Sequence, residues 1–262
     1  MASVDIQAVD DPASCRVAER IQREAWGMAD RGIVPAEQIR AIVHNGGLLL
    51  LAVLDGEPVG FCYGFVGLRG RDPVLCSHML AVLPRAQSHG IGRALKWAQH
   101  RLATERGFAA ITWTFDPLQA RNAYLNLHHL QAHARTYHVD HYGPMDDEIN
   151  AGMPSDRLLA EWPVTDPPLP RRNAVDAPWL LPPAIPAAPG HVDRSVLDGD
   201  AVRVAVPADV TALRAEHPDA PTTWRLALRA ALPPAFAADL VAVELLREVA
   251  DGTSAYLLER PL

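Results

Sequence analysis

The hydrophobic pattern of the first 163 residues alternates between short apolar runs and amphipathic stretches. Apolar runs of strand length, bounded by turn residues, predict buried β-strands. Such runs lie at residues 4–9, 48–54, 58–66, 73–84, 109–115 and 157–162. Amphipathic stretches with start and stop residues predict helices. They lie at residues 11–26, 35–44, 90–106 and 118–130.

The stretch at residues 90–106 has the clearest helical period. Its apolar residues fall on one helix face: Ile91, Ala94, Leu95, Ala98 and Leu102. Gly107 follows where a helix is expected to stop. Earlier in the chain, Asp55 and Gly56 separate two apolar runs, and this arrangement predicts a β-hairpin.

The composition changes after residue 163. Residues 164–196 are rich in proline, which predicts an extended linker or a strap on the surface. The last part of the chain, residues 197–262, shows strand, helix and hairpin patterns in the order β-α-β-β. We therefore expect a main domain at residues 1–163 in the α/β (α+β) class, and a small C-terminal unit that packs on it.

Composition and charge narrow the classes of function. The chain has 262 residues and 49% hydrophobic residues, so it is long and apolar enough to form a core. Its formal net charge is -7 and basic residues do not cluster, which argues against a nucleic-acid partner. The three cysteines form no CxxC pair, the N-terminus has no signal pattern, and no apolar run could span a membrane. These features predict a cytoplasmic protein without a membrane partner.

A glycine pair stands where the strand at residues 73–84 gives way to the helix at residues 90–106. The start of a helix exposes unpaired N–H groups and the positive end of the helix dipole, so it binds anions, and glycines let a phosphate come close. Two common phosphate motifs fail here. GxGxxG would need glycine in place of Leu95, and the P-loop would need Lys-Ser/Thr where the chain has Arg93-Ala94.

The sequence Gln87-Ser88-His89-Gly90-Ile91-Gly92 does fit the pattern QxxGxG, between a strand and a helix. With the order of predicted elements, it resembles the GCN5-related N-acetyltransferase (GNAT) superfamily over about residues 1–163. The stretches SHMLAV, WTFDPL and RNAYLN resemble a group of predicted GNAT proteins that carry a C-terminal extension. The resemblance implies a mixed, mostly antiparallel, twisted sheet flanked by helices, and acetyl-CoA as the cosubstrate.

The resemblance also implies which residues hold the cosubstrate. Backbone groups of the glycine loop would bind its pyrophosphate, namely Gln87, Ser88, His89, Gly90, Ile91, Gly92 and Arg93. The main chain of Leu80 and Val82 would meet the pantetheine arm, and Asn122 could form a hydrogen bond with CoA or cap the local backbone. Lys96, the only lysine, could reach a CoA phosphate or lie on a solvated helix face.

Acetyl transfer to an amine needs a base, a polarised carbonyl and an acid for the departing thiolate. Members of the family often place the acid, a tyrosine, on the helix after the fifth strand. In this chain Leu127 stands at that position, which is a departure. Tyr124 lies one turn earlier on the same helix face and is the best substitute, although it could equally be an aromatic that packs on the sheet.

Two residues are candidates for the base. His78 lies in the middle of the long strand, and a neutral imidazole there could accept the proton of the amine, or it could be a hydrogen-bonded core histidine. Asp116 follows the fifth strand and could act as base or contact the substrate, but an Asp-Pro turn at a strand end also explains it.

Two further clusters of residues could suggest a binding site, one of histidines and one of acidic residues. His129 and His133 are four residues apart, but neither HExxH nor a cysteine partner accompanies them, so no metal site is predicted. Asp146, Asp147 and Glu148 could attract a cationic amine or form a solvated acidic turn.

These observations predict an acyl-CoA-dependent N-acyltransferase, with acetyl-CoA as the expected acyl donor. We expect a small-molecule amine as the acceptor and direct transfer in a ternary complex, because no Cys–His nucleophile pair stands out. The alternative is a non-catalytic CoA-binding sensor or interaction module. The sequence leaves open the acceptor, the acyl chain and the oligomeric state, a homodimer included.

Overall fold

We describe the fold from a computed structural model, which covers residues 4–27, 32–87, 89–143, 153–185 and 188–262. It shows a mixed, mostly antiparallel β-structure flanked by helices, so the predicted fold class is confirmed. The chain forms two compact units. Unit 1 comprises Met1–Trp113 and Pro163–Pro167, and unit 2 comprises Thr114–Trp162 and Pro168–Leu262. The predicted boundary at residue 163 stays a prediction.

Unit 1 is a twisted sheet with the strand order β1-β2-β3-β4-β5. Its strands are β1 (Val4–Ala8), β2 (Leu48–Leu54), β3 (Glu57–Arg69), β4 (Asp72–Val82) and β5 (Ala110–Phe115), whose last two residues belong to unit 2. Its helices are α1 (Pro12–Trp26), α2 (Ala36–His44), the short 3-10 turn η2 (Pro84–Ala86) and α3 (Ile91–Glu105). Only β4 and β5 run parallel; the other neighbours are antiparallel.

Local sequence accounts for the ends of these elements. Asp11 caps α1, because its carboxylate accepts hydrogen bonds from the N–H groups of Ala13 and Ser14. Gly27 ends the same helix in the left-handed conformation, with φ of 60°. Asp55 and Gly56 also have positive φ and form the turn between β2 and β3, as the sequence predicts.

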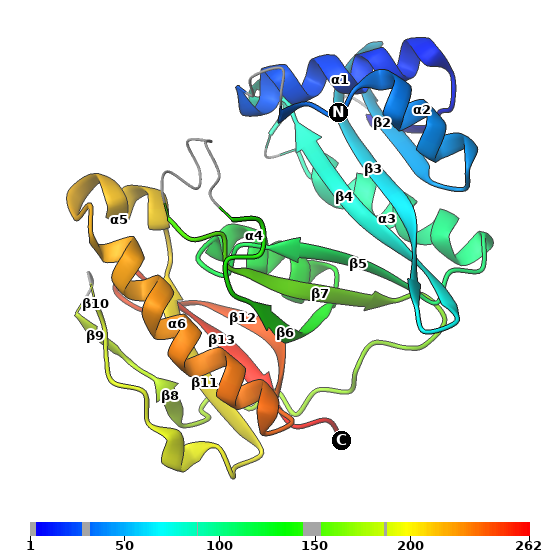
Figure 1. The fold of residues 1–262 in the computed structure, drawn as a ribbon. Helices are drawn as coiled ribbons and strands as arrows, with labels where there is room; N and C mark the ends of the chain where they lie inside the picture. The colour runs from blue at the N-terminus through cyan, green and yellow to red at the C-terminus, as the bar shows by residue number, and fades with distance from the viewer. Residues whose placement is uncertain (1–3, 28–31, 88, 144–152, 186–187) are drawn as a thin grey trace. The chain divides into compact units, whose positions relative to one another are not determined.

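Helices cover both faces of the sheet of unit 1 (Figure 1). On one face α1 and α2 bury a core that includes Ile21, Ile39 and Phe61. On the other face α3 packs against β2 and β3 through Ile91 and Leu95, two residues of the predicted apolar stripe. The apolar periodicity of the sequence therefore gives the correct inner face of α3.

Unit 2 has the strand order β7-β6-β12-β13-β11-β8. The strands are β6 (His133–His138), β7 (Arg157–Pro163), β8 (Trp179–Leu181), β11 (Ala201–Pro207), β12 (Val241–Ala250) and β13 (Thr253–Glu259), and β9 (Pro183–Ile185) pairs separately with β10 (Ala188–Pro189). The helical segments are α4 (Ala120–Tyr124), the π-helix η3 (Leu125–His129), the 3-10 turn η4 (Arg194–Val196), α5 (Val210–Glu216) and α6 (Ala220–Ala237). In Figure 1, α6 crosses in front of β11 and β13.

The C-terminal strands join the sheet of the preceding segment. β12 pairs with β6 at Ala242 and Ala134, and β12 and β13 form the predicted hairpin. Several features go beyond the sequence prediction. Short strands β8, β9 and β10 form in the proline-rich segment, and a second helix, α5, precedes α6. The expected helix 118–130 ends in a π-helix, and α6 continues through Pro233 and Pro234. Among the described residues, no helix has the length and apolar character needed to cross a membrane.

Candidate functional site

The middle of β4 contains a β-bulge at His78. Tyr63 of β3 pairs with Met79, and the next residue, Gly64, pairs with Ser77, so His78 has no partner in the register. A bulge bends its strand and increases its twist. Gly64 lies beside the bulge because the approach is close there: a Cβ on Gly64 would meet the carbonyl oxygen of Cys76 at 2.8 Å.

The strands β4 and β5 separate at the bulge. They pair in parallel only from Val74 with Ala110 to Cys76 with Thr112, whereas β4 continues to Val82. The bulge gives this separation a physical cause, because it bends and twists β4.

The separation leaves main-chain groups of β4 without a neighbouring strand. Leu83 donates its N–H to the carbonyl oxygen of Val59 in β3 at 2.8 Å. Main-chain N–H and C=O groups alternate in direction along a strand. Those of Ala81 and Leu83 therefore point toward β3, whereas those of Leu80 and Val82 point toward the open edge. Leu80 and Val82 thus present peptide groups that an extended ligand can pair with.

The glycine loop follows directly after this open edge. Gly90 is the N-cap of α3 with φ of 72°, and no side chain caps the helix among the described residues. A Cβ at Gly90 would meet nothing within 4 Å, and one at Gly92 would meet only Leu80 Cδ2 at 3.9 Å. The start of α3 is therefore an open set of N–H donors, and this suits a phosphate group.

The side chains of the loop hold its shape. Gln87 Nε2 donates to the carbonyl oxygen of Val82 at 3.2 Å, which ties the loop back to β4. His89 Nδ1 lies 2.8 Å from the carbonyl oxygen of Gln87. Arg93, the third residue of α3, has an exposed side chain. Ser88 lies outside the described residues.

His78 presents its imidazole on the bulge. The side chain is exposed and lies against two aromatic rings, with centroid distances of 5.6 Å to Phe65 and 6.2 Å to Tyr63. Although the residue is exposed by its surface area, partial desolvation of the ring lowers the pKa of His78 below its ordinary value. The imidazole is therefore neutral at neutral pH and can accept a proton.

Lys96 corrects a sequence expectation. Its side chain is 2% exposed, so it lies neither on a solvated helix face nor free to reach a phosphate. Nζ donates to Ser77 Oγ at 3.0 Å and lies 3.5 Å from the ring centroid of Trp113. The apolar periodicity could not reveal this, because it counts only apolar positions; the sole hint was that Lys96 directly follows Leu95 on the buried side of α3.

The remaining predicted residues belong to unit 2. The carboxylate of Asp116 is 8% exposed and forms a bidentate ion pair with Arg225 of α6, at 2.6 and 2.9 Å. Asp116 also accepts a hydrogen bond from the N–H of Leu118 at 2.9 Å. Both oxygens are thus engaged, which supports a structural role rather than that of a base.

Tyr124 stacks on a histidine in the short α4–η3 helix. Its ring lies 4.4 Å from that of His128 with an interplanar angle of 10°, and the guanidinium of Arg247 lies 5.2 Å above it. Leu127, at the position of the family tyrosine, is fully buried. Asn122 is exposed, whereas Asn126 is buried and its Nδ2 has no hydrogen-bond partner in the described part of the chain.

The structure also bears on two clusters noted in the sequence, the histidines near residue 130 and the acidic residues 146–148. His128 Nδ1 lies 3.0 Å from Glu244 Oε2. The described residues contain no group of three or more His, Cys, Asp or Glu side chains placed to hold a metal ion. Asp146, Asp147 and Glu148 lie outside the described residues.

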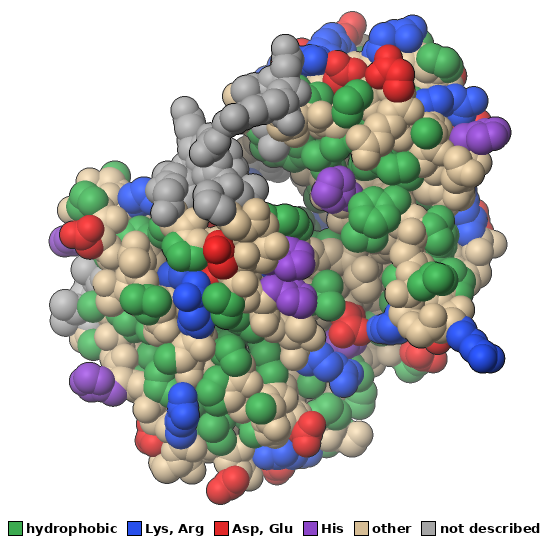
Figure 2. All heavy atoms as spheres, in the orientation of Figure 1, with side chains coloured by type: hydrophobic (Ala, Val, Ile, Leu, Met, Phe, Trp, Pro, Cys, Tyr) green, Lys and Arg blue, Asp and Glu red, His purple; other side chains and the backbone are tan. Residues whose placement is uncertain are grey.

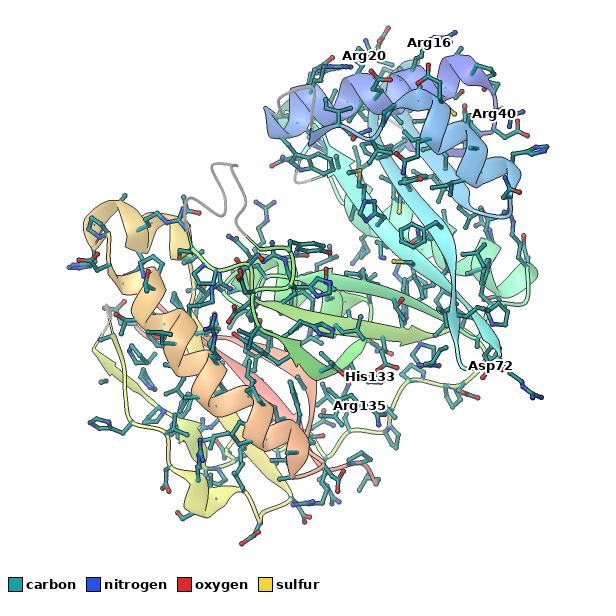
Figure 3. All side chains as sticks on the ribbon, in the orientation of Figure 1. Arg16, Arg20, Arg40, Asp72, His133 and Arg135 are labelled. Carbon is teal, nitrogen blue, oxygen red and sulfur yellow. The ribbon has the colours of Figure 1, made fainter. Side chains whose placement is uncertain are left out.

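Unit 1 also has a hollow of about 490 Å³ between α1 and α2. Arg16 of α1 and Arg40 of α2 line it (Figure 3). It lies on the helices that cover the face opposite α3, so it is separate from the glycine loop. On the face drawn in Figure 2, basic and acidic side chains are interspersed among the coloured residues, and no continuous basic area is visible there.

Comparisons with known proteins agree with this geometry. The model of the Acetyltransferase (GNAT) family matches residues 14–128, which include β4, the glycine loop and α3. No curated protein matches the chain in sequence. The ribosomal-protein-S18-alanine N-acetyltransferase from Escherichia coli has a similar structure, with 18% identity, a TM-score of 0.51, and coverage of 65% of this chain and 98% of that chain.

A second structure, a proposed acetyltransferase from Salmonella typhimurium with its cofactor acetyl-CoA, has 18% identity and a TM-score of 0.50 over 65% of this chain and 99% of that chain. At this identity the two structures show a shared fold. The family match covers less than half of the chain, so it marks residues 14–128 as similar to the GNAT family.

Proposed function

We propose that this protein is an acetyltransferase, which moves the acetyl group of acetyl-CoA to the amine of a small molecule by direct transfer in a ternary complex. The observation that carries the proposal is the open start of α3 at Gly90 and Gly92, next to the unpaired edge of β4. Together they offer N–H donors to a pyrophosphate and peptide groups to an extended pantetheine arm.

The cysteines support direct transfer. A covalent acetyl-enzyme would need an accessible thiolate. Burial raises the pKa of each of the three thiols, Cys15, Cys62 and Cys76, so they remain protonated at neutral pH. They are therefore poor nucleophiles.

His78 is our candidate for the base. Bound acetyl-CoA supplies a thioester, whose carbonyl carbon an uncharged amine can attack. His78 is neutral, exposed and next to the open edge of β4, so it can take the proton that the amine loses. Tyr124 remains the candidate for the acid from the sequence, and its stacking on His128 also gives it a packing role.

The proposal is tested by thiol release from acetyl-CoA over a panel of small amines, with His78→Gln and the exposed control His44→Gln. We expect His78→Gln to lower kcat about 100-fold with little change in acetyl-CoA affinity, and His44→Gln to behave as wild type. Because the pKa of His78 is lowered, the acidic limb of the wild-type rate should lie below the ordinary imidazole pKa of about 6.5.

Several outcomes would contradict the proposal. An acetylated enzyme that accumulates without acceptor would exclude direct transfer. An unchanged rate in His78→Gln would remove His78 as the base. Tight acetyl-CoA binding without turnover on any amine would favour the alternative, a CoA-binding module.

A further inference from the structure

Lys96 is the only lysine among the 24 lysine and arginine residues of the chain, and it is buried. Removing an ammonium group from water is costly unless its surroundings compensate for the lost solvation. Lysine differs from arginine in that burial readily lowers its pKa, whereas arginine keeps its proton in proteins. The chain thus has its one lysine where a basic group can both hold and release a proton.

The ammonium group bridges the two strands that separate. Nζ donates to Ser77 Oγ of β4 at 3.0 Å and to Gln99 Oε1 of α3 at 3.1 Å, and it lies 3.5 Å from the ring centroid of Trp113 in β5. Both of these acceptors are neutral groups, and the Trp113 ring adds a cation–π interaction.

Its position along the strands is specific. The last pair between β4 and β5 joins Cys76 to Thr112. Ser77 and Trp113 are the next residue on each strand, so Lys96 contacts both strands one step beyond their last pair. His78, the proposed base, follows Ser77 directly in the chain.

Burial lowers the pKa of Lys96 to about 8. The titratable groups that interact with it are Cys62 of β3, Cys76 of β4 and His100 of α3. Both thiols have raised pKa values and remain protonated near neutral pH, and the pKa of His100 is lowered, so Lys96 is the group of this cluster that titrates near pH 8.

We propose that Lys96 is a positioning residue for acetyl transfer, and that it acts through the Ser77 hydroxyl to protonate the departing thiolate. Nζ–H donates to Ser77 Oγ, and Cys62 Sγ lies 3.9 Å from that oxygen. The Ser77 proton can therefore turn from the Cys62 sulfur to the departing sulfur. When the C–S bond breaks, its electron pair goes to sulfur, sulfur takes the Ser77 proton, and a proton from Lys96 replaces it on Oγ. Lys96 is then neutral and takes up a proton from water.

This inference rests on the proposed function, and it supplies the acid that Leu127 does not provide. An acid whose pKa is near 8 is well matched to a thiol, whose ordinary pKa is about 8.5. The proposal also predicts an alkaline limb: as the pH rises through about 8, Lys96 loses its proton and acetyl transfer slows.

The first test compares Lys96→Met, Ser77→Ala and Tyr124→Phe with the control Arg101→Met, an exposed charge on α3. We expect Lys96→Met and Ser77→Ala each to lower kcat about 100-fold and to lose the alkaline limb, with acetyl-CoA affinity within about threefold of wild type. The double variant should be no slower than either single variant, because the two residues act as a unit. Arg101→Met should keep the wild-type pH profile.

The outcomes separate this inference from the proposed function. Turnover in Lys96→Met with the wild-type kcat and alkaline limb would overturn the role of Lys96 and leave the acetyltransferase intact. Loss of the limb in Tyr124→Phe alone would assign the acid to Tyr124. Absence of acetyl-CoA binding in the wild type would remove the proposed function itself, and the inference with it.

A second measurement needs no variant. Because the chain has one lysine, a sample labelled with ¹³C at lysine Cε gives a single lysine signal, and its chemical shift reports the titration of Lys96 directly. We expect the pKa measured with bound CoA to differ by about half a pH unit or more from that measured with bound desulfo-CoA, because a nearby thiol couples to Lys96. Identical titrations with the two ligands would contradict the proposed contact through Ser77.

Discussion

Asp116 and Lys96 are both buried charges, and the structure gives them opposite surroundings. The Asp116 carboxylate is matched by the Arg225 guanidinium in a bidentate pair. The Lys96 ammonium is hydrogen-bonded to the neutral side chains of Ser77 and Gln99. Burial disfavours the charged form of an amine, and it lowers the pKa of Lys96 to about 8.

Substitution of Asp116 tests its structural role. Asp116→Asn should destabilise the protein by about 3 kcal/mol, because it leaves the guanidinium of Arg225 buried without its counter-charge. Acetyl transfer at a temperature where the variant is folded should remain close to wild type. Denaturant unfolding and the acetyl transfer assay measure the two effects. If Asp116→Asn had wild-type stability but no activity, the result would contradict the structural role and support Asp116 as the base.

Replacement of Lys96 should have the opposite effect on stability. The pKa of Lys96 is lowered from 10.5 to about 8 in the folded state, so the ammonium opposes folding by roughly 3 kcal/mol at neutral pH. Lys96→Met should therefore be more stable than wild type at pH 7, and this difference should shrink as the pH rises from 8 to above 10. Urea unfolding at several pH values measures it. A pH-independent difference would contradict a lowered pKa.

The sequence predicted single residues well where a backbone rule applies. Asp11, Gly27 and Gly90 occupy the helix caps that their residue types favour. It failed at Lys96, because burial of a polar side chain depends on neighbours such as Ser77 and Trp113 that come from other strands. The partner of Asp116 was equally invisible, since Arg225 lies 109 residues away in the chain.

At the scale of elements, the site is a strand, a loop and a helix in succession. The bulge at His78 separates β4 from β5, the open edge at Leu80 and Val82 follows, and α3 begins at the glycines. The sequence predicted these elements within one or two residues at most ends. It gave no sign of the bulge, because a bulge depends on the register between β3 and β4 and not on the apolar pattern of one strand.

Gly92 allows the function of the helix start to be separated from its stability. Gly92→Glu fits sterically, because the nearest atom to a Cβ is Leu80 Cδ2 at 3.9 Å. A carboxylate in the first turn interacts favourably with the helix dipole, and a helix gains by the loss of a glycine, so the stability should be unchanged or higher by up to about 1 kcal/mol. Thermal unfolding of this variant, with Gly92→Ala as the control, measures it. A large loss of stability would show that Gly92 is needed for folding itself.

Two helices of unit 2 differ from what their local sequence favours. The expected helix at residues 118–130 begins as α4 and continues as the π-helix Leu125–His129. The longer helix of the C-terminal segment, α6, continues through Pro233 and Pro234, although proline normally ends a helix. In both cases tertiary packing overrides local preference.

At the scale of the whole molecule, the C-terminal segment contributes to the fold of unit 2. β12 pairs with β6, Arg225 neutralises Asp116, and the hydroxyl of Tyr256 donates to the carbonyl oxygen of Pro117 at 2.7 Å. The sequence showed the β-α-β-β order of this segment but not its partners, because strand pairing over more than a hundred residues leaves no local pattern.

A chain that ends at residue 163 tests this dependence. It keeps β7 beside β6 but lacks β12 and Arg225, so we expect it to lose the cooperative unfolding of the full chain and to be cleaved rapidly by protease. Limited proteolysis and thermal unfolding, with the full chain as the reference, measure the effect. A shortened chain that unfolds cooperatively at the temperature of the full chain would show that the first 163 residues fold independently.

Calorimetric titration with acetyl-CoA tests whether the start of α3 binds the cosubstrate. We expect saturable binding of one acetyl-CoA per wild-type chain. In Gly92→Glu we expect binding to be weakened about 100-fold or more, because the carboxylate would occupy the place of the pyrophosphate and repel its charge. Gly92→Ala should bind nearly as wild type. The absence of any heat or thermal shift with the wild-type chain, or equal binding by Gly92→Glu, would contradict the assignment of the helix start as the acetyl-CoA site.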